Sequence, residues 1–417
     1  MEHFDCVVIG GGMVGAASAL SLAQLGLRVA VVEQRTPEQY HQEQPFDLRV
    51  SAISLASEQL LSQLGAWFQI EQWRCCPYKR LAVWEDESAY TEFNAKEIKQ
   101  THLGHIVENR LIQLSLLEQL KVEKNIVLYC PESIVSLEQP QTGKAIVTLE
   151  KRTLETKLII GADGANSNVR QMANIGITGW DYQQSAMLIN VETELSQQDI
   201  TWQQYLPNGP VAFLPLQAFV NSESHNIQEN NTVRSESTAC FPGRASLVWY
   251  DTRDEIKRLS ALSNAQLTQA VLNHFPKRLG KVNVISQGAF GLTRRHANTY
   301  QNKQVVLLGD AAHTINPMAG QGVNLGFKDV KALRDVIADA IGHDECWYDT
   351  SVLSRYEKLR RHDNLLMMST MDALYAGFKH PSPVVKVARN LALHALNKVP
   401  FINTTIKSKA LAYACGI

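Results

Sequence analysis

A glycine-rich turn near the N-terminus constrains this chain more than any other feature of its sequence. Gly10, Gly12 and Gly15 form a G-x-G-x-x-G pattern between a strand-like run at residues 4–9 and an alanine-rich stretch at residues 16–25. A second apolar run follows, which predicts a strand–helix–strand unit with a right-handed crossover. Glycines at these positions permit a tight turn and let a pyrophosphate approach the backbone at the helix N-terminus. The pattern predicts dinucleotide binding; a tight turn without a ligand is the alternative.

An acidic residue at the end of the second strand narrows the choice of dinucleotide. Glu33 stands eighteen residues after Gly15, where a carboxylate accepts hydrogen bonds from ribose hydroxyls. A 2′-phosphate is disfavoured beside that carboxylate. The bound nucleotide is therefore expected to be FAD or NAD rather than NADP.

Two later motifs follow strands in the same way. Asp163-Gly164 ends a buried run in residues 158–170, and Gly309-Asp310 ends another in residues 308–326. Asp310 is placed to accept a hydrogen bond from a ribityl hydroxyl. The backbone amides that follow open a helix, whose N-terminus favours the negative charge of a reduced flavin. The residues expected to form this part of the cofactor site are Gly309, Asp310, Gly320, Gln321, Gly322, Val323 and Asn324.

Composition excludes several classes of protein. The chain has 417 residues, of which 45% are hydrophobic and 19% charged, and its net charge is −1. Disordered chains and proteins that coat nucleic acid have other compositions. The acidic start and the absence of a long apolar run predict no signal peptide and no transmembrane helix, so a cytoplasmic protein is expected. Seven cysteines without a C-x-x-C pair predict neither a disulfide framework nor a metal site.

The order of patterns predicts an α/β protein with an interrupted nucleotide-binding fold. Helices are expected at residues 52–70 and 108–120, and alternating strands at about 185–285. The polar stretch at 217–243 is interpreted as a mobile hairpin excursion. The predicted units are a Rossmann-like FAD-binding domain of residues 1–75, 101–180 and 286–345, a β-sheet substrate domain of residues 76–100 and 181–285, and a C-terminal helical region of residues 346–417.

The end of the chain is basic. No acidic residue follows Asp372, whereas residues 379–417 contain six lysines and arginines: Lys379, Lys386, Arg389, Lys398, Lys407 and Lys409. One interpretation is a helix packed on the core with its lysines in water. The other is a basic amphipathic surface that meets a membrane or an acidic partner.

Three motifs in this order resemble the class A flavoprotein aromatic hydroxylases, whose fold is that of para-hydroxybenzoate hydroxylase. In that resemblance Arg49 and Pro317 lie near the flavin, Arg110 approaches the FAD pyrophosphate, and Asp163 contributes to binding of both FAD and NAD(P)H. Segments along nearly the whole chain are similar to the ubiquinone-biosynthesis hydroxylases within this class. These segments are residues 49–55, 202–205, 213–216, 247–251 and 292–297.

The resemblance implies a reaction. NAD(P)H reduces FAD, O2 forms a flavin C4a-hydroperoxide, and one oxygen is transferred to the ring of a polyprenylated methoxy-methyl-benzoquinol. Other proteins of ubiquinone biosynthesis and a peripheral membrane contact through residues 379–417 are the implied partners; nucleic acid is not. The alternatives are a sibling hydroxylase acting at another ring position or on another phenol, a flavin reductase or halogenase, and a non-catalytic lipid-binding scaffold. A halogenase is expected to carry W-x-W-x-I-P, which the chain lacks.

Two sets of site residues have competing interpretations. His313 is a candidate general base, and the alternative is a histidine that orders its loop by hydrogen bonding. Aromatic residues on the expected substrate sheet either line the ring pocket or belong to the core: Trp202, Tyr205, Phe213, Trp249 and Tyr250.

Overall fold

The protein is described by a computed structural model that covers residues 1–141, 143–218, 242–315, 320, 322–379 and 407–416. Three of the sequence-based predictions therefore lie wholly or mostly outside the described residues. They are the polar excursion at 217–243, Pro317 with Gln321, and most of the basic tail.

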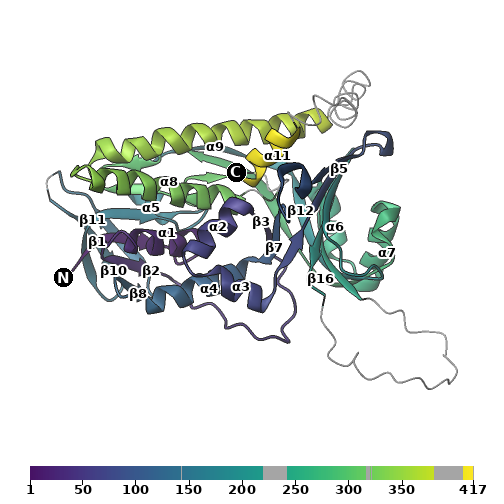
Figure 1. The fold of residues 1–417 in the computed structure, drawn as a ribbon, viewed down its shortest axis with the longest axis horizontal. Coiled ribbons are helices and arrows are strands. Elements are labelled where there is room, and N and C mark those ends of the chain that lie inside the picture. The colour runs from purple at the N-terminus through teal and green to yellow at the C-terminus, as the bar shows by residue number, and fades with distance from the viewer. Residues whose placement is uncertain (142, 219–241, 316–319, 321, 380–406, 417) are drawn as a thin grey trace.

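The first sheet is mainly parallel and carries the nucleotide-binding pattern (Figure 1). Its order is β17-β18-β11-β1-β2-β8, with β10 and β9 added beside β11. Ile9 lies beside Val32 and beside Gly161, and Gly161 lies beside Leu307. Because parallel strands end at the same edge, this register brings the three motifs together. The strands are β1 Glu2–Ile9, β2 Val29–Val32, β8 Ile126–Tyr129, β9 Ile134–Glu138, β10 Ala145–Leu149, β11 Thr153–Gly161, β17 Gln301–Asn302 and β18 Val305–Leu307.

Helices cover this sheet with apolar faces. The alanine-rich α1 is buried from Gly15 to Ala23 and contacts both α4 and α8, while α9 packs along α8 (Figure 1). Strand β1 is buried at Cys6, Val7 and Val8, as expected for a central strand covered on both faces. The helices are α1 Met13–Ala23, α4 Asn109–Val122, α5 Asn168–Met172, α8 Gly322–Gly342 and α9 Thr350–Lys379.

The second sheet is mainly antiparallel, and α6 and α7 pack on one face of it. Its order is β19-β16-β12-β15-β14-β13-β5-β6. Its two long strands, β12 and β16, pair along most of their lengths and extend toward the first sheet (Figure 1). The elements are β5 Arg80–Trp84, β6 Thr91–Asn94, β12 Ile177–Thr193, β13 Ile200–Leu206, β14 Gly209–Leu216, β15 Gly243–Thr252, β16 Val282–Ala297, β19 His313–Thr314, α6 Arg253–Ser260 and α7 Asn264–His274. Short 3-10 turns are η1 Glu87–Ala89, η2 Ala95–Ile98, η3 Lys277–Leu279 and η4 Gly309–Ala311.

The helix predicted over residues 52–70 is wrong at its start and in its middle. Strand β3 (Val50–Ser54) pairs with β7 (Gly104–Glu108), which also pairs with β4 (Cys76–Tyr78) in a third sheet. Ser54 then caps helix α2 (Leu55–Gln63), and α3 (Trp67–Trp73) follows Gly65, which has φ 77°. Pairing with a distant strand and a left-handed glycine thus override the apolar periodicity. Helix α4 confirms the helix predicted at 108–120.

The described end of the chain returns to the body of the molecule. Helix α11 (Ser408–Cys415) buries Leu411 and Cys415 in an apolar cluster with Tyr78 and Leu103. Among the described helices, none combines the length and the apolar composition needed to cross a membrane. The boundaries of the predicted domains remain a prediction.

Candidate active site

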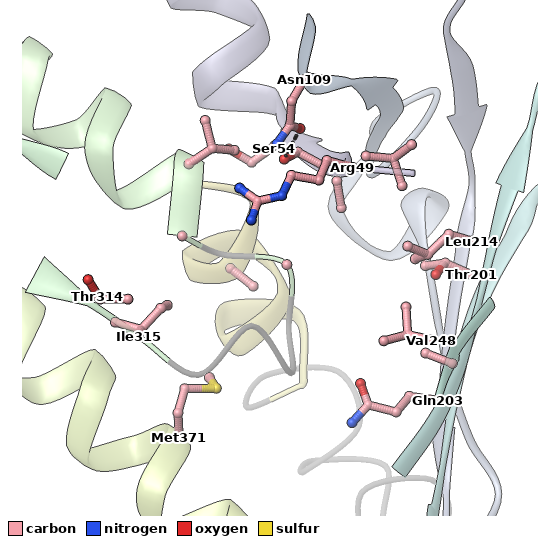
Figure 2. A pocket seen from close by; sticks show the side chains of 18 of the residues that line it. Arg49, Ser54, Asn109, Thr201, Gln203, Leu214, Val248, Thr314, Ile315 and Met371 are labelled. Atoms are coloured by element: carbon pink, nitrogen blue, oxygen red, sulfur yellow. Dashed lines mark hydrogen bonds between the residues drawn. The ribbon is translucent and has the colours of Figure 1, made fainter. Parts of the chain in front are cut away.

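A large cavity opens between the two main sheets. Its volume is about 1260 Å³ (Figure 2). The carboxyl edge of the first sheet and its glycine turn form one side, and the second sheet forms the other. Helix α11 and the end of α9 complete the wall. The cavity is therefore long enough to be shared by a nucleotide cofactor and a second ligand.

The glycine turn is built for close backbone contact. A Cβ on Gly15 would lie 1.9 Å from the carbonyl oxygen of Gly10, and a Cβ on Gly10, whose φ is 106°, would lie 2.4 Å from the carbonyl oxygen of Ala162. A Cβ on Gly12 would meet nothing within 4 Å, and Gly12 lines the cavity. Two glycines thus serve packing, and the third leaves an open backbone surface at the start of α1 where a pyrophosphate fits.

Glu33 ends β2 beside this turn. Its carboxylate accepts hydrogen bonds from the backbone N–H groups of Gly11 at 2.7 Å and Arg35 at 2.9 Å. The side chain is only partly buried, and a carboxylate with two oxygens has further lone pairs for ribose hydroxyls. The observed position suits the predicted contact, which stays a prediction.

Arg110 does not line the cavity. Its Nε donates to Asp47 at 3.0 Å and one terminal nitrogen donates to Glu38 at 3.2 Å. The adjacent Asn109 does line it, and the Nε2 of Gln113, one turn further along α4, donates to the carbonyl of Gly11 at 3.1 Å. Helix α4 therefore braces the glycine turn.

Arg49 and Asp310 both line the cavity. Figure 2 shows the Arg49 side chain extending from the segment before β3 into the open space. Asp310 follows β18 in η4 and lies at the cavity surface. Desolvation by the surrounding protein raises the pKa of the Asp310 carboxyl. Electrostatic interaction with His313 and Arg49 offsets part of that rise. The two side chains supply opposite charges to one ligand space.

Asp163 is tied to its own loop. One carboxylate oxygen accepts from the backbone N–H groups of Asn168 at 2.7 Å and Val169 at 3.1 Å, and the other is buried without a partner. Asp163 does not line the cavity, whereas its neighbours Gly164 and Ala165 do. An unsatisfied buried carboxylate oxygen is costly unless a ligand or water completes it.

Arg170 joins the two later motifs, a role that sequence reasoning missed. It is buried, and it donates to the carbonyl oxygens of Ala311 at 2.9 Å and Ala165 at 3.2 Å. A basic residue seven positions after Asp163 is the only sequence signal for this contact.

His313 does not line the cavity, so the described residues give no support to its role as a general base, which stays a prediction. It is 2% exposed, and its Nε2 lies 2.6 Å from a carboxylate oxygen of the fully buried Asp329. The same oxygen accepts the backbone N–H of Gly309 at 3.0 Å, and the other accepts the Nε of Arg360 at 2.7 Å. Burial acts to raise the pKa of Asp329, but His313 and Arg360 outweigh it and the net shift is downward. The alternative interpretation, a histidine that orders its loop, fits this geometry.

The cofactor residues predicted around the start of α8 have two different roles in the structure. Gly320, Gly322 and Val323 line the cavity. Asn324 is buried instead, because its amide oxygen accepts from the Ser54 backbone N–H at 3.0 Å and its amide nitrogen donates to the Ala52 carbonyl at 2.8 Å. Asn324 thus locks α8 to β3 rather than facing a ligand.

The aromatic residues proposed for the ring pocket divide between the cavity and the core. The cavity is lined by Trp202, Tyr205 and Tyr250. Phe213 and Trp249 lie in the core on the opposite face, because side chains alternate along a strand. Trp202 stacks on Phe213 at 5.4 Å between ring centroids, so its ring belongs mainly to that core.

A cluster of two histidines and a glutamate lies outside the cavity lining. Glu58 on α2 accepts from His102 at 2.8 Å and His105 at 3.1 Å through one carboxylate oxygen. These contacts hold α2 against the start of β7 and against the segment just before it, which carries the cavity residue Leu103. Burial raises the pKa of Glu58, but the two histidines lower it to about 2.

Comparisons with known proteins show the class of protein to which this chain belongs. The sequence pattern of the family described as "FAD binding domain" matches residues 3–363. Two solved structures share the fold over nearly the whole chain. The p-nitrophenol 4-monooxygenase PnpA from Pseudomonas putida has a TM-score of 0.75 at 18% identity, covering 99% of this chain and 98% of that one. PqsL, a probable FAD-dependent monooxygenase from Pseudomonas aeruginosa, has a TM-score of 0.71 at 21% identity, covering 94% and 99%. The fold is that of the flavin-dependent aromatic hydroxylases.

The family within this class follows from sequence. The 3-demethoxyubiquinol 3-hydroxylase of Escherichia coli is 43% identical over 99% of this chain and 98% of its own. The "Ubiquinone hydroxylase UbiL" of Rhodospirillum rubrum is 32% identical, covering 95% of this chain and 86% of its own. The chain belongs to the family of ubiquinone-biosynthesis flavin hydroxylases and is an FAD-dependent monooxygenase.

The described residues fit an FAD molecule. The open Gly12 surface, the partly accessible Glu33 and the cavity-lining Asp310 lie along one edge of the first sheet. FAD, reduced by NAD(P)H, supplies the activation of O2 in this class. The chain's own residues have to hold the cofactor, position the second ligand and exclude water.

Proposed function

We propose that this protein hydroxylates the ring of a polyprenylated methoxy-methyl-benzoquinol in ubiquinone biosynthesis, with NAD(P)H and O2 as co-substrates. The observation that carries the proposal is a cavity shared by the cofactor edge of one sheet and a face of the other sheet with many apolar residues. The 43% identity to a 3-demethoxyubiquinol 3-hydroxylase supports the ring chemistry.

Each part of the cavity wall has a proposed task. The glycine turn and Glu33 hold the pyrophosphate and ribose of FAD, and Asp310 holds the ribityl chain. Arg49, whose side chain reaches the same space (Figure 2), contributes positive charge near the flavin. Arg110 and Asp163 support the cofactor site indirectly, because their hydrogen bonds fix the loops next to the cavity. The backbone amides at the start of α8 face the flavin. Pro317, the other candidate near the flavin, is outside the described residues.

A prenylated substrate needs an apolar environment for its tail. One isoprene unit has five carbons, and at about 0.8 kcal/mol per buried CH2 its exposure to water costs roughly 4 kcal/mol. The wall near α11 offers Leu103, Leu411 and Cys415 as apolar contacts. We propose that the ring enters the cavity while the distal tail stays in a membrane or in a partner protein of the pathway.

A peripheral membrane contact from the cytoplasmic side is the proposed source of substrate. Residues 379–417 carry six basic residues, each worth at most about 1 kcal/mol at an anionic surface. One of the six is already used: Lys407 is buried and pairs with Glu97 at 2.9 Å. The proposal therefore rests on the remaining five.

Membrane binding is tested by flotation with anionic liposomes. Replacing Lys386, Arg389 and Lys398 by glutamine is expected to reduce the floated fraction, while α11 stays intact. A matched variant that replaces the exposed Lys96, Lys121 and Lys144 controls for total charge. Equal flotation of all three proteins would show that the basic tail does not bind the membrane.

Two other candidate functions can be distinguished from this one by experiment. A sibling hydroxylase would use the same cofactor site on another ring position or another phenol. A non-catalytic lipid-binding scaffold would have no need for the complete cofactor edge, so NADH oxidation stimulated by a quinol would exclude it.

The first experiment is a mass spectrum of quinone lipids from cells that lack this gene. The proposal expects a demethoxy intermediate to accumulate, and the wild-type gene to restore ubiquinone. Asp310→Ala is expected not to restore it, whereas Asp335→Ala, on the half-exposed side of α8, is expected to do so. Accumulation of an earlier intermediate would assign a sibling reaction, and unchanged ubiquinone would place the substrate outside this pathway.

A further inference from the structure

One polar side chain interrupts a row of aliphatic residues that the second sheet presents to the cavity. Gln203 on β13 lies between Val83 on β5 and Ala212 on β14 in the strand register. The same row continues through Val248 on β15 and Leu188 on β12. All five residues line the cavity, and the other four are aliphatic.

The amide of Gln203 has an unused hydrogen-bond donor. Its Nε2 is buried and has no partner. Figure 2 shows the side chain extending from β13 toward the side of the cavity where Ile315 and Met371 lie. By contrast, the hydroxyl of Thr201, two residues earlier, donates to the carbonyl oxygen of Phe213 at 2.8 Å.

A second unpartnered polar atom in the described cavity wall has a different location. The Oγ1 of Thr314 is buried without a partner and belongs to β19, which follows the cofactor motif at Gly309 and Asp310. β19 and β13 belong to the same sheet, but β13 stands five strands away from β19 and so away from the cofactor motif. The missing partner of Gln203 is therefore sought on the second ligand rather than on the cofactor.

We infer that Gln203 donates a hydrogen bond to a ring oxygen of the aromatic substrate. A buried donor without a partner costs about 1–3 kcal/mol, and a ligand acceptor removes that cost. A quinol carries such acceptors in its hydroxyl and methoxy oxygens, and a prenyl tail carries none. This inference rests on the proposed function and makes Gln203 a specificity-determining residue of that site.

The contact would set the orientation of the ring. Along this otherwise aliphatic row, van der Waals contact holds a flat ring but does not distinguish its rotations. One directional bond at a known point removes that ambiguity, and it selects the ring carbon that faces the cofactor. Sites built around one such bond reject analogues that lack the bonded group.

The test measures binding of the one-isoprene form of 2-polyprenyl-3-methyl-6-methoxy-1,4-benzoquinol to the FAD-loaded enzyme under anaerobic conditions. Analogues in which one oxygen substituent at a time is replaced by hydrogen are compared by calorimetry. In the wild type, loss of one particular oxygen is expected to weaken binding about tenfold, which corresponds to about 1.4 kcal/mol. In Gln203→Met, which keeps the side-chain length, the same loss is expected to have no effect.

Gln204→Met is the matched control. Gln204 is the next residue of the same strand, does not line the cavity and projects from the opposite face. It is expected to discriminate among the analogues as the wild type does. FAD content and the thermal midpoint establish that each variant is folded, and Gln203→Leu replaces Gln203→Met where the latter fails this check.

A second measurement reports the orientation of the substrate ring during turnover. The productive reaction converts NAD(P)H, H+, O2 and a ring C–H group into NAD(P)+, water and a ring C–OH group. With a misoriented ring, the same two electrons reduce O2 to H2O2. Gln203→Met is expected to raise the share of NAD(P)H that appears as H2O2, with the rate of NAD(P)H oxidation changed less.

The outcomes separate the two proposals. A wild type that neither binds nor hydroxylates the quinol overturns the proposed function. A wild type that does both, together with a Gln203→Met variant that keeps the same oxygen discrimination and the same product yield, overturns the role of Gln203 alone.

Discussion

At the residue scale, the buried carboxylate of Asp329 shows how distant residues determine the direction of a side chain. Asp329 joins the Gly309 backbone, His313 and Arg360, and Asn364 donates to its second oxygen at 3.2 Å. The sequence places His313 three residues after Asp310, which suggests a catalytic role. The partner that turns it away stands sixteen residues further on, in a helix whose rotation about its axis only packing determines.

Removing the charge of Asp329 should destabilise the protein. In Asp329→Asn the buried Arg360 and His313 lose their shared anion, and breaking a buried pair typically costs about 3–5 kcal/mol. Urea unfolding measures the loss, and FAD content is expected to fall because Gly309 loses its anchor. Asp335→Asn on the same helix is the control, with a change below about 0.5 kcal/mol. Equal stability of the two variants would contradict the structural role of Asp329.

His296 should make stability depend on pH. It is 5% exposed, and its Nε2 lies 3.0 Å from the hydroxyl of Tyr300, which in turn accepts from Asn364. Burial, together with the charges of His313, Arg361 and Arg294, lowers the pKa of His296 to about 4. Between pH 6.5 and 4 the unfolded chain therefore binds a proton that the folded protein does not, so stability falls as the pH falls.

The expected loss for His296 is up to roughly 3 kcal/mol over that interval. Unfolding free energies at pH 7, 6 and 5 measure it. His296→Gln removes the titrating group and should flatten this part of the profile. The contribution of His296 is refuted where wild type and variant show the same slope.

At the element scale, the strand–turn–helix unit contains one glycine that folding requires and another that is open for cofactor binding. Gly15→Ala places a methyl group 1.9 Å from the Gly10 carbonyl oxygen and should disrupt the turn. Gly12→Ala meets no protein atom within 4 Å and should fold, yet its methyl group occupies the surface proposed for the pyrophosphate. Circular dichroism and bound-flavin absorbance distinguish the two effects. A Gly12→Ala protein with full FAD content would place the pyrophosphate elsewhere.

Helix α11 should affect the substrate more than the cofactor. Leu411 is 5% exposed, lines the cavity and packs in the cluster that includes Tyr78 and Leu103. Leu411→Ala is expected to cost about 2–3 kcal/mol of local stability and to raise KM for a prenylated quinol, with FAD content unchanged. Lys121→Ala, at an exposed position of α4 outside the cavity lining, is the control. Loss of FAD in Leu411→Ala would place the cofactor nearer to α11 than proposed.

At the scale of the whole molecule, the cavity is a product of two sheets that contribute different chemistry. The parallel sheet ends its strands in motifs with backbone amides and carboxylates, and the antiparallel sheet contributes an aliphatic row with one amide. Neither half encloses a ligand by itself. Two solved structures at 18% and 21% identity share this architecture, with TM-scores of 0.75 and 0.71.

Much of the fold was predictable because its signals are local. Buried-strand runs, an alanine-rich helix and three strand-end motifs predicted the nucleotide-binding sheet, and the resemblance carried by those motifs predicted the class of enzyme. The helix at 52–70 failed because β3 exists only through its pairing with β7, about 50 residues away. The sequence left open whether Phe213 and Trp249 line the pocket or belong to the core, because alternation in a strand predicts two faces without naming the one that meets the cavity.

By itself the sequence determined the cofactor turn, the buried parallel strands and the chemical class, since each depends on residues that are neighbours in the chain. The tertiary structure decided which side chains meet a ligand. Lys407 pairs with Glu97, 310 residues away, and is therefore unavailable to a membrane. His313 faces Asp329, and Gln203 faces the cavity. Such choices depend on how whole sheets and helices pack, because the free energy of a buried polar group is set by partners that no local pattern specifies.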